Sequence, residues 1–92
     1  MRDQRRTERQ SVSGRGLLIQ GSTQVAVELR DRGPWGFGVV AASPVRTGAP
    51  VTLRLPRSDS SESYFCLAPY CQPHSDRFHV GLRILSLLPE GI

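Results

Sequence analysis

Apolar and polar residues alternate over several short stretches of the chain, and glycine or proline bounds each stretch. Residues 23–30 (TQVAVELR) and 51–55 (VTLRL) have an apolar residue at every second position. A period of two is typical of a strand that buries one face. The side chains predicted to face inward are Val25, Val27, Leu29, Val51, Leu53 and Leu55.

The C-terminal third continues this pattern. Residues 64–71 (YFCLAPYC) and 77–85 (RFHVGLRIL) predict a last pair of strands, after a polar hairpin loop over residues 56–63 (PRSDSSES). In the final strand, the side chains predicted to share the inward face are Phe78, Val80, Leu82 and Ile84, while His79 and Arg83 take the other face. No segment before Leu85 has apolar positions at the helical period of 3.6 residues over two turns.

The pattern therefore predicts an all-β fold with six short strands. Open sheet edges invite pairing with other chains, and closure into a small barrel removes them. We expect a six-stranded antiparallel β-barrel.

Composition limits the chain to a single domain. It has 92 residues, of which 38% are hydrophobic and 22% charged. No apolar run approaches the roughly 20 residues of a membrane-spanning helix, and the charged N-terminus precedes no secretion-type apolar segment. We expect no membrane span and a cytoplasmic location. There, Cys66 and Cys71 are expected to be reduced structural thiols, because two cysteines make a poor zinc site.

The basic residues are all arginine, and four of the twelve lie within the first nine positions. The net charge of +4 is thus concentrated near the N-terminus. The guanidinium group pairs with phosphate and with the edge of guanine, and it stacks on flat rings. This makes an anionic or nucleotide ligand a candidate, whereas composition alone favours a solvated basic tail.

Signatures of catalysis are missing from the sequence. There is no G-x-S-x-G nucleophile motif, and a phosphate-binding G-x-x-x-x-G-K-[ST] loop requires a lysine that the chain lacks. The carboxylates show no paired or metal-ligand spacing. We expect no enzymatic activity, no catalytic residues, no metal and no cofactor.

Two short motifs stand out together. Residues 5–9 (RRTER) have the spacing R-x-x-x-R, and residues 31–36 (DRGPWG), which begin 22 residues after Arg9, read D-x-G-x-x-G and lead into an apolar strand. In this order and spacing the chain resembles the PilZ domain family, the small bacterial receptors for cyclic di-GMP. The resemblance extends through residues 36–55 to the Val-Gly pair in the last strand, and so covers the chain from about Arg5 to Leu85.

The resemblance implies an arginine-rich, flexible ligand-binding arm over residues 1–10 and a PilZ-like barrel over residues 11–92. The expected ligand-binding residues are Arg5, Arg9, Asp31, Gly33 and Gly36. Arginine can bind the phosphates or stack on the guanines, and the Asp31 carboxylate can accept from the guanine N1–H and N2–H₂ groups. Gly36 allows a sharp turn and a close backbone approach.

Gly33 stands where the family most often has serine. Losing one neutral hydrogen bond costs about 0.5–1.5 kcal/mol, or roughly three- to tenfold in affinity. Trp35 can compensate by stacking on a guanine, or it can instead cap the open end of the barrel. Leu85, Leu87, Leu88 and Ile92 can pack as a short turn on the barrel or form an exposed apolar patch.

Three functions follow from these observations. The first is a cyclic di-GMP receptor that changes conformation on binding and signals to a downstream protein, in bacterial motility or biofilm regulation. The second is a degenerate PilZ-like barrel that has lost the ligand and serves as a protein interaction module. The third, a basic barrel that binds DNA or RNA, is disfavoured because Phe37, Phe65 and Phe78 do not interleave with the arginines. We expect a monomer or weak dimer.

Overall fold

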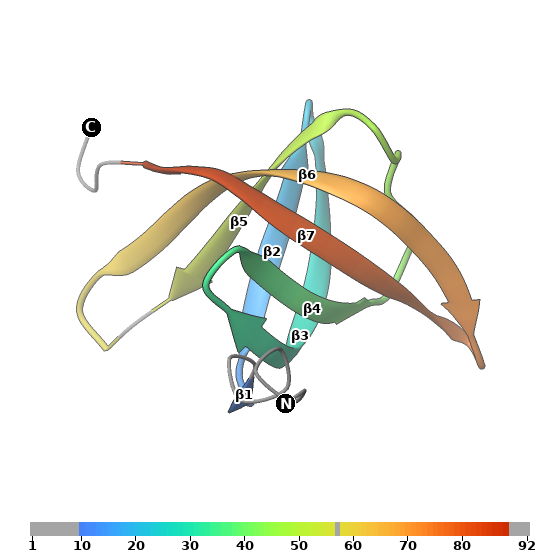
Figure 1. The fold of residues 1–92 in the computed structure, drawn as a ribbon, viewed down its shortest axis with the longest axis horizontal. Coiled ribbons are helices and arrows are strands. Elements are labelled where there is room, and N and C mark those ends of the chain that lie inside the picture. Colours follow the sequence, from blue (N-terminus) through green and yellow to red (C-terminus); the bar gives the residue numbers. More distant parts are fainter. Residues whose placement is uncertain (1–9, 57, 89–92) are drawn as a thin grey trace, which may run out of the picture.

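The computed structural model describes residues 10–56 and 58–88. These residues form antiparallel strands joined by short turns (Figure 1). The strands are β1 (Gln10–Ser11), β2 (Arg15–Gln20), β3 (Thr23–Gly33), β4 (Gly36–Ala41), β5 (Pro50–Pro56), β6 (Ser61–His74) and β7 (Arg77–Leu88). The described residues contain no helix of the length and apolarity needed to cross a membrane.

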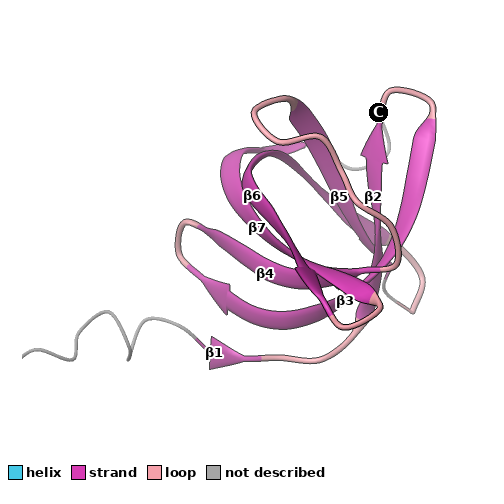
Figure 2. Cartoon of the chain, turned by 90° about the vertical axis from the view of Figure 1, so that its right-hand side faces the viewer, coloured by secondary structure: helices cyan, strands magenta, loops and turns pink. Residues whose placement is uncertain are grey.

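Six of the strands close into one barrel, as predicted from the sequence. The hydrogen-bonded order β3-β2-β5-β6-β7-β4 is closed by the pairing of β4 with β3 (Figures 1 and 2). The short strand β1 pairs with the last residues of β3, beyond the segment of β3 that β2 occupies.

The barrel interior is filled by the faces that the alternation predicted. The predicted inward residues that are buried are Val25, Val27, Val51, Leu53, Leu55, Val80 and Leu82. Leu29, Phe78 and Ile84 are partly buried and pack against this core. Phe37 and Leu18, at 2% and 0% exposure, are among the largest side chains inside.

The predicted loop over residues 56–63 is too long. Strand β6 already begins at Ser61, because residues 61–63 pair with residues 54–56 of β5. Their serines suggested a loop, but tertiary pairing overrides such local preferences. The second half of β6 also contains Pro69 and Pro73, and it pairs only with β7. Proline is tolerated there because an edge strand can lose a hydrogen-bond donor.

A polar cluster covers the core beside the turn between β3 and β4. The Arg32 guanidinium lies 5.2 Å from the centre of the Phe37 ring and donates a 3.0 Å hydrogen bond to the Tyr64 hydroxyl. That hydroxyl donates in turn to Glu62 at 3.1 Å. Burial, and then the bond to Glu62, raises the pKa of Tyr64. Arg32 thus stays hydrogen-bonded against the aromatic edge of the core.

The two cysteines are free thiols with different surroundings. Cys66 is fully buried, and burial raises the pKa of its thiol to about 11, whereas Cys71 is partly exposed. Thiolate is the reactive form. With a thiol-reactive disulfide reagent at pH 8, Cys71 should react in the native protein and Cys66 only after unfolding. Equal native rates at both positions, measured by mass spectrometry of labelled peptides, would contradict this placement.

A pair of leucines tests the position of the core. Leu53 is fully buried, and Leu87 is 63% exposed near the end of β7. We expect Leu53→Ala to lower the free energy of unfolding by about 2–5 kcal/mol through lost burial and a cavity. Leu87→Ala should change it by about 0.5 kcal/mol or less. Urea unfolding of both variants measures the difference, and similar losses would be inconsistent with this barrel.

A candidate ligand pocket over two paired glycines

Four strands bring an acid, two glycines and an aromatic residue into one row on the outside of the barrel. Asp31 of β3 pairs with Gly38 of β4, Gly38 pairs with Gly81 of β7, and Gly81 pairs with Tyr70 of β6. Directly opposed residues in neighbouring strands have their side chains on the same face. The two glycines have no side chains, so the surface between Asp31 and Tyr70 is backbone on which the two larger side chains can lie.

The larger side chains of the row lie over the glycines. A Cβ atom added to Gly38 would lie 2.8 Å from Asp31 Oδ2, and one added to Gly81 would lie 2.6 Å from Tyr70 Cζ. Any other residue at these positions would push the carboxylate or the ring aside. Glycine inside a strand costs roughly 0.5–1 kcal/mol relative to alanine, so this arrangement is obtained at some expense in stability.

A β-bulge in β3 turns Asp31 toward this row. Leu29 pairs with Val39 but Asp31 pairs with Gly38, so Arg30 is an extra residue in β3. Regular alternation would have put Asp31 on the inward face with Leu29. The bulge reverses the faces, and Arg32 instead reaches the aromatic rings of the core.

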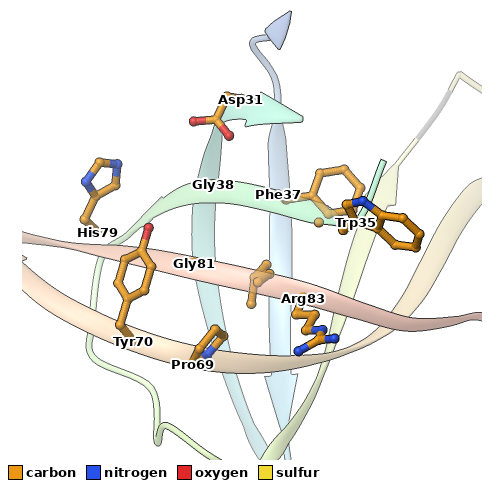
Figure 3. A pocket seen from close by; sticks show the side chains of 11 residues that line it. Asp31, Trp35, Phe37, Gly38, Pro69, Tyr70, His79, Gly81 and Arg83 are labelled. Carbon is orange, nitrogen blue, oxygen red and sulfur yellow. The ribbon is translucent and has the colours of Figure 1, made fainter. Parts of the chain in front are cut away.

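The row is the centre of a pocket of about 640 Å³ (Figure 3). The residues lining it are Asp31, Trp35, Gly36, Phe37, Gly38, Pro69, Tyr70, His79, Gly81, Leu82 and Arg83. In Figure 3, Tyr70 and His79 lie at one end of the pocket, and Trp35 and Arg83 lie at the other. His79 and Arg83 face outward as predicted.

The walls offer complementary chemistry to a flat, polar, anionic ligand. Asp31 supplies two acceptor oxygens and Arg83 a permanent cation. Trp35 and Tyr70, 75% and 44% exposed, supply aromatic surfaces. Among the described residues, no group of three or more histidine, cysteine, aspartate or glutamate side chains could hold a metal ion.

Trp35 does not cap the barrel. Its exposure of 75% at the tip of the turn between β3 and β4 contradicts that alternative, and Arg32 lies against the buried Phe37 and Tyr64 instead. The backbone of Trp35 is held by Ile84, whose N–H donates to the Trp35 carbonyl at 2.8 Å. The indole therefore stands at the pocket rim.

The predicted ligand residues have different places. Asp31 and Gly36 line the pocket, whereas Gly33 pairs with Gly36 but is not in the lining. Gly36 serves strand packing, because an added Cβ would collide with the Leu82 carbonyl oxygen. Arg5 and Arg9 lie outside the described residues.

Sequence reasoning missed three of the four residues of the row. Gly38, Tyr70 and Gly81 were not singled out as site residues, because their proximity depends on the register of three strand pairs. One signal was available: Asp31 is a charged residue at the next inward position after Leu29. That conflict with the alternation indicates a bulge.

The chain enters the barrel beside this pocket. Gln10 pairs with Arg32, and Ser11 pairs with Asp31. The N–H of Val12, the residue after β1, then donates to the Arg30 carbonyl at 3.1 Å. The chain is therefore also hydrogen-bonded to β3 at the bulge. The segment before Gln10, which contains both arginines of the first motif, is thus covalently attached next to Asp31.

Comparison with models of known protein families and with curated proteins gave no match.

Two glycines of β4 provide a test of this packing. In Gly36→Ala, the new methyl group meets rigid backbone at Leu82, and we expect a loss of about 3 kcal/mol in the free energy of unfolding. In Gly38→Ala, the three atoms nearest to the methyl group all belong to the end of the Asp31 side chain, which can shift more easily than backbone. Its stability should stay within about 1 kcal/mol of the parent, because alanine is the better strand residue. Chemical denaturation compares them; equal losses would argue against this register.

Proposed function

We propose that this protein is a receptor for cyclic di-GMP that acts as a non-enzymatic adaptor in the bacterial cytoplasm. The observation that carries the proposal is the pocket itself, in which Asp31, Tyr70, Trp35 and Arg83 surround a floor of two glycines. Cyclic di-GMP has two guanines and two phosphates. It needs carboxylate acceptors, flat surfaces and cations, and the pocket has all three.

The dimensions and chemistry of the pocket support this ligand. A volume of about 640 Å³ falls within the roughly 300–1,000 Å³ range of small-molecule sites. The Asp31 carboxylate can accept two hydrogen bonds from the N1–H and N2–H₂ edge of one guanine. Arg83 can pair with a phosphate, and the exposed indole of Trp35 offers a surface for a base.

The arginines of the N-terminal motif complete the proposed site. The chain joins the barrel at Gln10, which pairs with Arg32 beside Asp31. Arg9 directly precedes Gln10 in the sequence, and in this proposal both Arg9 and Arg5 contact the ligand. In this proposal, the arm covers the bound ligand and so presents a changed surface to a downstream protein.

Exposed apolar residues favour a second candidate, a ligand-free protein interaction module. Trp35, Leu85 and Leu87 are 75%, 47% and 63% exposed. Such side chains are frequent in protein interfaces when they form a patch. This candidate keeps the barrel and dispenses with the nucleotide, and Gly33 in place of serine is consistent with it.

Isothermal titration calorimetry of cyclic di-GMP into the purified chain tests the proposal, with GTP and cyclic di-AMP as controls. Selective binding at micromolar affinity or better supports the receptor and gives the ligand stoichiometry. No heat, together with unchanged amide NMR shifts at Asp31, Gly38 and Gly81, would reject the receptor in favour of the interaction module.

The proposed role of the N-terminal arginines predicts which substitutions weaken cyclic di-GMP binding. Arg5→Ala or Arg9→Ala should weaken cyclic di-GMP binding by roughly tenfold or more, because each removes a charge-assisted hydrogen bond worth about 1.5–3 kcal/mol. Arg46→Ala is the matched control. Arg46 is exposed, and its backbone N–H and C=O, rather than its guanidinium, bond to the Gln20 side chain at 2.9 and 3.0 Å. Equal losses in all three variants would indicate diffuse electrostatic attraction instead.

A further inference from the structure

Tyr70 presents an aromatic surface at the pocket end next to His79. Its ring rises from β6 and lies over Gly81 (Figure 3), where an added Cβ would meet Tyr70 Cζ at 2.6 Å and the hydroxyl oxygen at 3.0 Å. One side of the ring is therefore fixed against the backbone of β7. The residue is 44% exposed and lines the pocket, so part of its side chain is open to a ligand there.

The Tyr70 ring and the Asp31 carboxylate approach each other from opposite ends of the row. The carboxylate lies over Gly38 and the ring over Gly81, and these two glycines are directly paired. Neighbouring strands are about 4.8 Å apart. The carboxylate and the ring thus lie above adjacent strands, and a flat ring laid on Tyr70 would have its edge directed toward Asp31.

We propose that Tyr70 is a base-stacking residue of this site. One guanine of cyclic di-GMP stacks on the open side of the phenol ring while its N1–H and N2–H₂ groups donate to Asp31. This inference rests on the proposed function and assigns to it a residue outside both sequence motifs. The glycines at positions 38 and 81 are what allow the carboxylate and the ring to share one base.

Three substitutions of Tyr70 distinguish stacking of its ring on a base from mere covering of Gly81 by its side chain. Tyr70→Phe keeps the ring and should bind cyclic di-GMP within about threefold of the parent. Tyr70→Ala should bind roughly tenfold or more weakly, as expected when an aromatic side chain is removed from a base. Tyr70→Leu still covers Gly81 with apolar atoms but offers no ring, and it should be weakened as Tyr70→Ala is.

Calorimetry gives the dissociation constants, and thermal unfolding of each variant shows that it is folded. Parent-like affinity in Tyr70→Leu would overturn the stacking role, because covering the glycine would then suffice. Parent-like affinity in both Tyr70→Ala and Tyr70→Leu would overturn any role of Tyr70 in binding and leave the receptor intact. Failure of the parent chain to bind would overturn the proposed function itself, and that result comes before any variant is titrated.

Discussion

A single extra residue in β3 decides what the outer face of this barrel can do. Arg30 has no partner of its own in β4, and its insertion reverses the alternation for the rest of the strand. Asp31 is thereby placed on the outer face above Gly38, and Arg32 is placed against Phe37 and Tyr64. Without the bulge, a carboxylate would face the apolar core, where an unpaired charge is costly. One irregularity thus supplies both the acceptor of the pocket and the cation at the edge of the core.

The glycines of β4 and β7 perform two distinct tasks. Gly36 has no space for a side chain because backbone of β7 lies against it, so it is required by the closure of the barrel. At Gly38 and Gly81, the nearest atoms belong to the side-chain ends of Asp31 and Tyr70. These two glycines are required by the outer face rather than by the fold. Gly36 and Gly38 both line the pocket, but only Gly36 is also required by the contact between the β4 and β7 backbones.

The sequence predicted the barrel and its interior well, because burial with a period of two is a local property of each strand. Val25, Val51 and Val80 were placed correctly for this reason. The start of β6 and the row from Asp31 to Tyr70 were not predicted, since both depend on pairings between strands far apart in the chain. Asp31 and Gly36 were found through the motif at residues 31–36, whereas Tyr70 and Gly81 lie in no motif. Alternation indicates which face of the sheet a residue lies on, but it does not indicate which residue of the adjacent strand lies opposite. Register therefore cannot be obtained from alternation alone.

The attachment of the N-terminal segment at Gln10 has a thermodynamic consequence. Because β1 pairs with Arg32 and Asp31, everything that precedes it is tethered at the edge of the pocket. A short tether gives an effective concentration on the order of millimolar, independent of the protein concentration. Any contact that a group attached before Gln10 made with the pocket would be intramolecular, and dilution would not weaken it. A peptide tag or a fused domain at this end would act on the pocket at the same effective concentration, whereas β7 ends on the side of the barrel away from β1 (Figures 1 and 2).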